Sequence, residues 1–243
     1  MTYRVDLHIH TDASDDGLSP LAEQAAAAKA AGLDAIAVTD HNQCTPVPAE
    51  LNGVLLIPGC EVSTRDGHIT GLFLEVPLDW QILRAEGLPT GEAAAAEIHR
   101  RGGLAVLAHP FQSPRADPSR FTFPLDGVEA ANSRASFKVR DANQRAAELA
   151  RIRRLPAVGG SDGHSRFEVG NAYTEVHCPQ RTLAALKQAI AAGNCQAVLV
   201  RQTPCYRKGL SQLGKARRKG GVKALAKGLV YLGYCGVRDL FHL

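Results

Sequence analysis

The chain has 243 residues, of which 45% are hydrophobic, 21% charged and 5% aromatic, a composition that excludes disordered and collagen-like proteins. This length suffices for one large core, or for a core with a small appendage. The net charge of +4 is unevenly distributed, because residues 201–243 contain ten Lys or Arg and one acid (+9), whereas the other 200 residues contain 18 basic and 23 acidic residues (−5). We therefore predict a main domain over residues 1–203 and a basic, helical extension over residues 204–243.

The amino terminus and the cysteines indicate where the protein resides. The first residues, MTYRVDLHIH, contain no apolar segment of the kind that secretory signals carry. The six cysteines lie far apart and form no C-x-x-C pair, which is typical of reduced thiols in the cytoplasm. Only ten uncharged residues separate Lys227 from Arg238, against the ~20 that a membrane-crossing helix needs. We therefore expect a cytoplasmic protein without a membrane span.

Short apolar runs alternate along the chain with alanine-rich segments, a pattern that favours a parallel sheet with helices packed outside it. Strands are predicted at residues 4–7, 35–39, 54–58, 69–74, 104–108, 127–130, 157–160 and 172–176. Helices are predicted at residues 20–31, 91–101, 143–153 and 182–192. Ser19 is expected to cap the first helix, and Gly32 to end it in a left-handed conformation. Residues 76–89 and 111–124 are expected to form loops beside the site.

Residue types that bind metals follow nearly every predicted strand. They are His8 and His10, Asp40 and His41, Glu61, His109, Glu129, and Asp162 with His164. Because the carboxyl ends of parallel barrel strands meet at one face, these side chains should converge there. His8 and His10 are two residues apart on a strand, so both imidazoles point to the same side. Mixed imidazole and carboxylate ligands suit Mn²⁺, Fe²⁺ or Zn²⁺, and the lack of thiolates argues against a closed structural zinc site.

Four residues near these positions admit two interpretations. Asp15 and Asp16 lie in a turn, where one of them could reach the metals or both could serve the turn alone. His68 opens a strand and could project to either side. If its strand extends far enough, Cys60 faces away from Glu61 and into the core.

Seven segments, taken in order, resemble the PHP family, which is named for its polymerase and histidinol phosphatase members. They are DLHIHTDASDDG, AVTDHN, PGCEVS, GHITGLF, VLAHP, GVEAANSR and VGGSDGHS, within residues 3–176. The resemblance implies a distorted (β/α)₇ barrel of the metal-dependent phosphoesterase branch, with two or three divalent ions (Mn, Fe or Zn). Only 40 residues separate His68 from His109, which leaves little room for the domain that larger members insert there.

The resemblance also implies roles for individual residues. One ion would be held by His8, His10, Glu61 and Asp162. Glu61 would bridge to a second ion, bound by His68 and His109. A third ion would be held by Asp15, His41 and His164, because the family spacing puts the carboxylate five positions after the second histidine and so selects Asp15 over Asp16. Asp162, Glu61 and His109 would take part in catalysis through the metals and a bridging water.

The activity that this resemblance implies is hydrolysis of a phosphomonoester or phosphodiester. Adjacent divalent ions lower the pKa of a bridging water to about 7, which supplies a hydroxide nucleophile, and they offset charge on the phosphoryl group. A guanidinium pairs bidentately with phosphate oxygens, so Arg134, Arg115 and Arg120 are candidates for holding substrate phosphate. We favour Arg134 because it follows a predicted strand end. The basic extension favours a polyanionic substrate, such as a nucleotide or short RNA, but it could equally dock on the acidic body.

Three alternatives remain open from the residues alone. A histidinol-phosphatase-like enzyme would act on a small phosphorylated molecule instead. An amidohydrolase also begins with H-x-H, but that family bridges its metals with a carboxylated lysine, whereas Glu61 takes that place here. The alternative from another class is a non-catalytic PHP module that binds metal or nucleic acid, which the complete set of expected ligands argues against.

Overall fold

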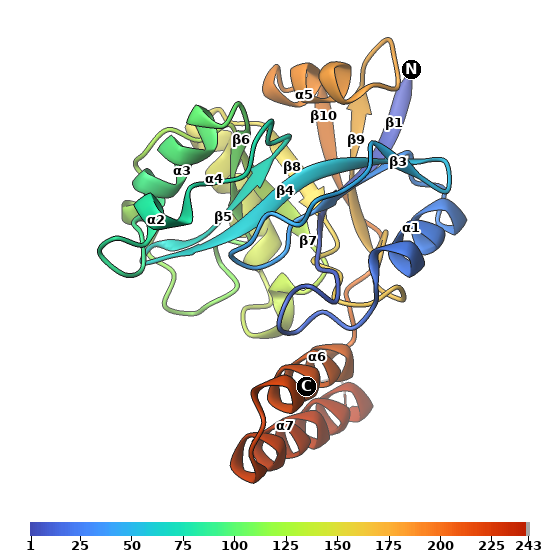
Figure 1. The fold of residues 1–243 in the computed structure, drawn as a ribbon, viewed down its shortest axis with the longest axis vertical. Coiled ribbons are helices and arrows are strands. Elements are labelled where there is room, and N and C mark those ends of the chain that lie inside the picture. The colour runs from blue at the N-terminus through green and yellow to red at the C-terminus, as the bar shows by residue number, and fades with distance from the viewer. Residues whose placement is uncertain (242–243) are drawn as a thin grey trace.

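The computed structural model describes residues 1–241, apart from the side chain of Pro118, and shows a nearly closed mixed α/β barrel followed by two helices (Figure 1). The strands are β1 (Thr2–Ile9), β2 (Ala35–Val38), β3 (Glu50–Leu51), β4 (Val54–Thr64), β5 (Gly67–Leu72), β6 (Leu104–Ala108), β7 (Gly127–Asn132), β8 (Ala157–Gly160), β9 (Ala172–His177) and β10 (Cys195–Leu199). The helices are α1 (Leu21–Ala30), α2 (Trp80–Leu83), α3 (Gly91–Arg100), α4 (Ala142–Arg153), α5 (Leu183–Ala191), α6 (Cys205–Lys219) and α7 (Val222–Phe241), with 3₁₀ turns at Pro118–Arg120 and Ala135–Phe137. The predicted distorted barrel with a helical extension is confirmed.

The sheet has the strand order β10-β9-β1-β2-β4-β5-β6-β7-β8, but it is not parallel throughout as predicted. β1, β2 and β4 are parallel, as are β6, β7 and β8. β5 runs antiparallel to both of its neighbours, and β9 runs antiparallel to β1 and β10. Only Arg65 and Asp66 separate β4 from β5, too few residues for the crossover that a parallel pair requires.

The predicted elements are all present, although β4 continues to Thr64 rather than ending at Pro58 and so carries Glu61 within a strand. The prediction missed the short or late elements β3, β10 and α2. The predicted cap at Ser19 was wrong, because the Ser19 hydroxyl accepts a hydrogen bond from the Arg166 N–H (3.2 Å) and not from the helix. Gly32 ends α1 with a φ of +71°, as predicted.

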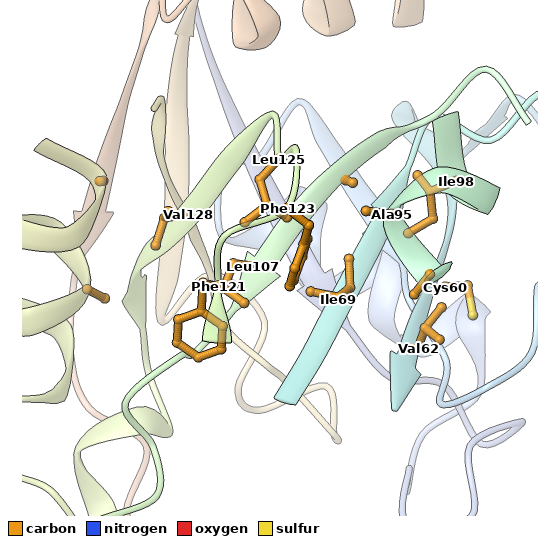
Figure 2. Close-up of a cluster of buried hydrophobic side chains, with 14 of the residues drawn as sticks. Cys60, Val62, Ile69, Ala95, Ile98, Leu107, Phe121, Phe123, Leu125 and Val128 are labelled. Carbon is orange, nitrogen blue, oxygen red and sulfur yellow. The ribbon is translucent and has the colours of Figure 1, made fainter. Parts of the chain in front are cut away.

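An apolar cluster fills the space between strands β4 to β7 and helix α3 (Figure 2). Cys60 lies in this cluster and is fully buried, so it faces away from Glu61 as predicted. A Cβ at Gly71 would lie 2.9 Å from the Ile98 Cγ1, so only glycine allows α3 to lie this close to β5. Full burial of a side chain such as Ile98 stabilises the fold by about 1.5–3 kcal/mol. The barrel is thereby a rigid support for the residues at its strand ends.

Helices α6 and α7 form a hairpin, and α6 lies between the barrel and α7 (Figure 1). The Asp239 carboxylate accepts hydrogen bonds from the N–H groups of Cys205 (2.8 Å) and Tyr206 (2.7 Å), which caps the first turn of α6. The Arg218 guanidinium donates to the carbonyls of Ser14 (2.7 Å) and Gly17 (2.8 Å) and so fastens α6 to the loop between β1 and α1. No helix within residues 1–241 is long and apolar enough to cross a bilayer. The division into domains at residue 203 stays a prediction.

Candidate metal centre

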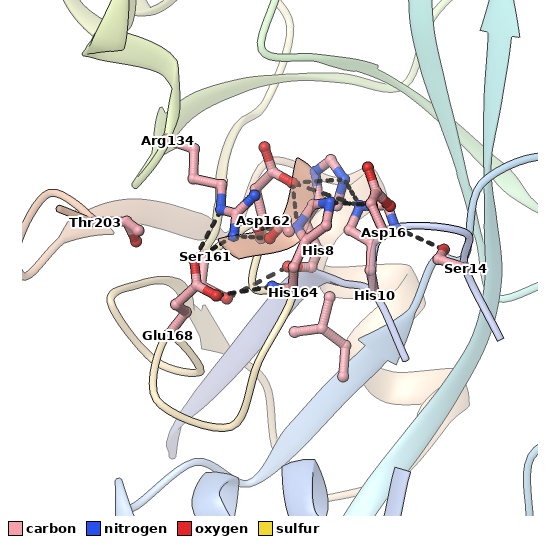
Figure 3. A network of polar contacts seen from close by, with 12 residues as sticks. His8, His10, Ser14, Asp16, Arg134, Ser161, Asp162, His164, Glu168 and Thr203 are labelled. Atoms are coloured by element: carbon pink, nitrogen blue, oxygen red, sulfur yellow. Dashed lines mark hydrogen bonds and ion pairs between the residues drawn. The ribbon is translucent and has the colours of Figure 1, made fainter. Parts of the chain in front are cut away.

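The first group of predicted ligands meets at the carboxyl end of β1 (Figure 3). The Nε2 atoms of His8 and His10 lie 3.1 Å apart. Glu61 Oε2 lies 3.5 and 3.3 Å from these two atoms, and Asp162 Oδ1 lies 3.9 and 3.4 Å from them. Four ligands placed tetrahedrally at about 2.1 Å from a shared ion are about 3.4 Å from one another. The distances from the two imidazoles to each other and to both carboxylates, 3.1 to 3.9 Å, are therefore close to those within a metal's ligand shell.

Glu61 is shared between this group and a second one. Its Oε1 atom lies 2.7 Å from His68 Nδ1 and 2.9 Å from His109 Nε2, and its carboxylate is fully buried. The pairing of β5 with β6 places His68 opposite Ala108, directly before His109, so the two imidazoles arrive on the same side of Glu61. A carboxylate whose two oxygens face separate sets of imidazoles is suited to bridging two ions.

The third group contains Asp16 and not the predicted Asp15. Asp16 Oδ1 lies 3.4 Å from His164 Nε2 and 3.7 Å from His41 Nε2. Asp15 is instead exposed at the wall of the cleft beside the centre, and its carboxylate lies 2.9 Å from the Lys215 ammonium on α6.

The tight turn after His10 explains this correction. A Cβ at Gly17 would lie 1.7 Å from the Thr11 carbonyl oxygen, so the loop folds back on itself at a point that only glycine permits. The Gly17 N–H donates to the Ser14 carbonyl (3.3 Å), which closes the turn and leaves Asp16 buried and Asp15 exposed. The sequence spacing of five positions after the second histidine does not show which side chain of the turn faces the centre.

Among the described residues, three buried polar atoms in the centre have no hydrogen-bond partner, namely Asp16 Oδ1, His41 Nδ1 and Glu61 Oε2. The last two are only 2.9 Å apart, but their orientation does not form a hydrogen bond, as expected when both point toward a shared third atom. Leaving such atoms unpaired costs about 1–3 kcal/mol each. Divalent cations would satisfy all three, so the residues present fit metal ions that accept imidazole and carboxylate ligands.

Several of the buried groups hold one another in their charged forms, whereas burial and the neighbouring His164 and His41 lower the pKa of His10 well below its usual value. Burial alone would raise the pKa of Glu61 and of Asp162, but the imidazoles around them hold both pKa values well below the usual range. Burial lowers the pKa of a histidine, yet Glu129, Glu61 and Asp162 raise the pKa of His8 well above its usual value. The same opposition, with Glu61 as the main carboxylate, raises the pKa of His41 to about 9. Metal binding must therefore displace protons from these histidines.

The backbone is strained where it delivers two of the predicted ligands. Asp162 and His109 have φ values of +54° and +27°, a region that costs a residue other than glycine about 1–3 kcal/mol. Each follows a strand end, at β8 and β6 respectively. Within β8, a Cβ at Gly160 would lie 2.4 Å from the His8 Cβ, so only glycine allows β8 to pass this close to β1. The surrounding barrel thus holds the ligands in positions that a relaxed chain would not adopt.

Glu129 on β7, which the sequence placed among the converging residues without assigning it to an ion, contacts two of the predicted ligands. Its Oε1 atom pairs with His8 Nδ1 (3.0 Å), and its Oε2 atom accepts hydrogen bonds from the His109 N–H (2.8 Å) and the Asn132 amide (3.0 Å). A carboxylate on the far nitrogen of a metal-binding histidine fixes the tautomer and the ring orientation. The position of Glu129 at a strand end was the available signal, but its partner His8 lies 121 residues away.

Arg134, the predicted ligand of substrate phosphate, lines the space beside the centre, and part of its guanidinium is held by protein groups. Its Nε and Nη2 atoms both donate to Glu168 Oε1 (2.8 and 2.6 Å; Figure 3), and Nη2 also donates to the Ser211 hydroxyl on α6 (3.0 Å). The other oxygen of Glu168 accepts from the Ser165 hydroxyl (2.8 Å) and the His164 N–H (3.3 Å). The buried guanidinium therefore ties the loop of His164 to the helical hairpin.

The other two arginine candidates lie on the far side of His68 and His109. Arg115 lines a cavity of about 240 Å³ beside these two histidines. Arg120 lines the same cavity but pairs with the Asp66 carboxylate at 2.7 Å. Arg115 thus lies beside His68 and His109, and the structure shows no ion pair that occupies its guanidinium among the described residues.

A cleft of about 450 Å³ opens over the metal centre, and α6 forms one of its walls. Lys208, Gln212 and Lys215 reach into it from α6, facing predicted ligands that include His41 and Asp162. A second cavity, of about 580 Å³ between α6 and α7, shares these three residues and is also lined by Lys138, Lys219 and Lys227. The basic extension therefore does dock on the body, and in doing so it brings lysines to the mouth of the site.

The fold and the site together define a metal-binding α/β barrel with a centre of several adjacent ligand groups. Residues 6–99 match the PHP domain family, and residues 140–195 match the PHP-associated family. An uncharacterized protein of Methanocaldococcus jannaschii is 33% identical over 151 residues, which cover 54% of this chain and 82% of that protein. A probable phosphatase of Acetivibrio thermocellus is 28% identical over 202 residues, which cover 70% of this chain and 83% of the relative.

A crystal structure from Bacteroides vulgatus shares the fold. The crystallised protein has two domains and contains a predicted PHP-like metal-dependent phosphoesterase. The match has a TM-score of 0.59 and 23% sequence identity, and it covers 82% of this chain and 65% of that protein. The chain described here thus spans somewhat less than two thirds of that protein's length. On these matches the chain belongs to the PHP domain family, and its barrel is of the predicted PHP type.

Proposed function

We propose that this protein is a metal-dependent phosphoester hydrolase that acts over two or three divalent ions (Mn, Fe or Zn). The observation that carries the proposal is the buried Glu61 carboxylate, whose two oxygens face His8, His10 and His41 on one side and His68 and His109 on the other. Family membership supports the same reaction class, as does the name probable phosphatase that a relative carries.

In this proposal His8, His10, Glu61 and Asp162 hold one ion, His68 and His109 hold a second with Glu61, and Asp16, His41 and His164 hold a third. When bound, such ions lower the pKa of a bridging water and offset the charge of a phosphoryl group. Asp162, Glu61 and His109 keep their assignment to catalysis through the metals. Glu129 is a positioning residue, because it acts on His8 and not on the substrate.

We further propose that the substrate is nucleotide-like or a short oligonucleotide. Lys208 and Lys215 line the cleft beside the centre, and the adjoining cavity adds Lys138, Lys219 and Lys227, so a second anionic group of the substrate would meet several ammonium groups. Arg115 stands on the opposite side of the centre, beside His68 and His109. A cytoplasmic location fits the six cysteines, which are all free thiols.

The hydrolase proposal is tested by metal analysis and by paired variants. Purified protein should hold about two to three Mn, Fe or Zn per chain, and chelation should abolish hydrolysis of a chromogenic phosphate. Asp162→Ala and Glu61→Ala should remove activity while circular dichroism shows a folded chain. His99→Ala is the matched control, because His99 lies on α3 and pairs with Asp126 away from the centre. Less than one ion per chain after reconstitution with each metal would contradict a centre of several ions.

The substrate proposal has its own test. Lys208→Gln/Lys215→Gln should lower kcat/KM for a nucleotide bisphosphate by about tenfold or more, since each lost hydrogen bond to a charged group costs about 1.5–3 kcal/mol. The same variant should retain hydrolysis of the chromogenic phosphate, and Arg217→Gln/Lys223→Gln, which changes two exposed cations of the hairpin, is the control. Cleavage of histidinol phosphate but of no nucleotide would favour the small-molecule phosphatase. Full metal loading without any hydrolysis would favour a non-catalytic module.

A further inference from the structure

The two faces of α7 have very different surroundings. On its inner face Gly228 and Cys235 are buried, and a Cβ at Gly209 of α6 would lie 2.9 Å from the Leu232 Cα, so the two helices are in close contact. Because α6 lies between α7 and the barrel, the opposite face of α7 points away from the protein (Figure 1).

This outward face is mostly apolar, with Lys223 as the charged residue within it near the start of the helix, and we call its apolar row the outer stripe. The outer stripe consists of Val222, Ala226, Leu229, Val230, Tyr234, Val237, Leu240 and Phe241. Its members recur at intervals of mostly three or four residues, the spacing of one helix face. They are exposed, up to 86% for Val222 and 74% for Val230. A row of exposed apolar side chains along one helix face is typical of a surface that binds a protein or a membrane.

The hairpin that carries the outer stripe is strongly basic. Residues 205–241 contain nine Lys or Arg and a single acid, Asp239, whose carboxylate caps α6. Lys227 borders the outer stripe and lines a shallow apolar surface with Val230 and Tyr234. Lys223 is exposed beside Val222. An apolar helix face bordered by lysines on a cationic support is typical of a helix that lies in the headgroup layer of a membrane.

Charge also decides between a membrane and a second copy of the chain. Nine basic residues and one acid give each hairpin a net charge of +8, so pairing two outer stripes would bring two such hairpins together. An anionic lipid surface complements this charge, and burial of the apolar face among the lipids adds hydrophobic binding energy to the electrostatic attraction. We propose that the outer stripe of α7 docks the protein on an anionic bilayer, with the helix lying in the plane of the headgroups.

Vesicle sedimentation of the full chain tests this proposal. The wild-type protein should sediment with phosphatidylcholine vesicles that contain about 30% phosphatidylserine and stay in the supernatant with phosphatidylcholine alone. Leu229→Ser/Val237→Ser should lower the partition coefficient at least tenfold, because fewer apolar groups would be buried in the headgroup layer. The matched control is Ile82→Ser/Ile152→Ser on α2 and α4. The four side chains are 53%, 51%, 55% and 63% exposed in this order, so neither variant disturbs a core.

Several results would overturn the proposal. One is the absence of sedimentation with anionic vesicles, and another is equal sedimentation with neutral ones. Equal binding by the stripe variant and the wild type would show that charge alone attracts the hairpin. A dimer in sedimentation velocity that only the stripe variant dissociates would identify a second copy as the occupant. None of these readouts depends on metal or on hydrolysis, so the outcome is independent of the proposed enzymatic activity.

Discussion

Replacing Glu129 by Gln removes a charge from the support of the metal centre while it keeps the side-chain shape. In the native chain Oε1 faces His8 Nδ1, and Oε2 accepts from the His109 N–H and the Asn132 amide. A glutamine has one carbonyl oxygen, which the two donors on the Oε2 side would hold, so its NH₂ group would face His8 Nδ1. His8 would then keep its lone pair at Nδ1 and carry the proton on Nε2, the atom that faces Glu61 and Asp162.

We expect Glu129→Gln to weaken binding of the first metal about 10- to 100-fold, or about 1.4–2.7 kcal/mol, the usual loss when the partner of a metal-binding histidine is removed. Competition with a chromogenic chelator measures this affinity. Glu148→Gln is the control, because Glu148 lies on the surface of α4 and pairs with Arg151. The melting temperature of the metal-free variant should change little, since the contacts to His109 and Asn132 survive.

A role of Glu129 in fixing the His8 tautomer would be refuted by a metal affinity of Glu129→Gln within about twofold of the wild type, a change far smaller than the loss of such a partner usually causes. A drop in metal affinity accompanied by an equal drop in the stability of the metal-free chain would also refute it. In that case Glu129 would be holding the fold and not the tautomer.

Three further results are expected. Asp16→Asn should lower the metal content by one ion per chain in elemental analysis, whereas Asp15→Asn should leave it unchanged, and the opposite pattern would restore the assignment by spacing. Metal binding near neutral pH should release protons, because the raised pKa of His41 keeps this imidazole protonated in the metal-free protein until the pH passes about 9. Calorimetry in buffers of different ionisation enthalpy measures the number of protons released. This release should therefore shrink as the pH rises through 9, and a release independent of pH would contradict it. Gly160→Ala should lower the melting temperature, since overpacking typically costs about 1–3 kcal/mol and the new Cβ would meet His8, and an unchanged melting temperature would show that β1 can move aside.

The strand positions and the gathering of histidines and carboxylates could be predicted because both depend on local patterns. Apolar runs set where strands end, and residues at those ends share one face of a barrel. The spacing of His8 and His10 correctly predicts that both side chains lie on the same face, because side chains alternate strictly between the two faces of a strand. The continuation of β4 past Pro58 could not be read in this way, since Gly59 interrupts the apolar run and only pairing with β5 keeps the strand extended there.

The positions of Asp15, Asp16 and Arg134 depend on contacts between distant parts of the chain. Nothing in the sequence around Arg134 indicates that it pairs with Glu168, which is 34 residues away. When this partner is not known, an arginine at a strand end is read as a ligand of phosphate. The choice between Asp15 and Asp16 depends on a turn whose direction is set by Gly17 and by Lys215 from α6. The spacing of residues within one segment gives no information about either contact, so the carboxylate of the third group could be chosen only from the structure.

The Arg134–Glu168 pair has a consequence for how the protein opens and closes. Glu168 receives the His164 N–H on one oxygen and Arg134 on the other, and Arg134 in turn holds Ser211 of α6. Breaking a buried pair of this kind costs about 3–5 kcal/mol, so fluctuations that detach α6 must also loosen the loop of His164. Hydrogen exchange at the amides of α6 should therefore slow when metal binds, although no predicted ligand lies on that helix. The hairpin and the metal centre then behave as one cooperative unit.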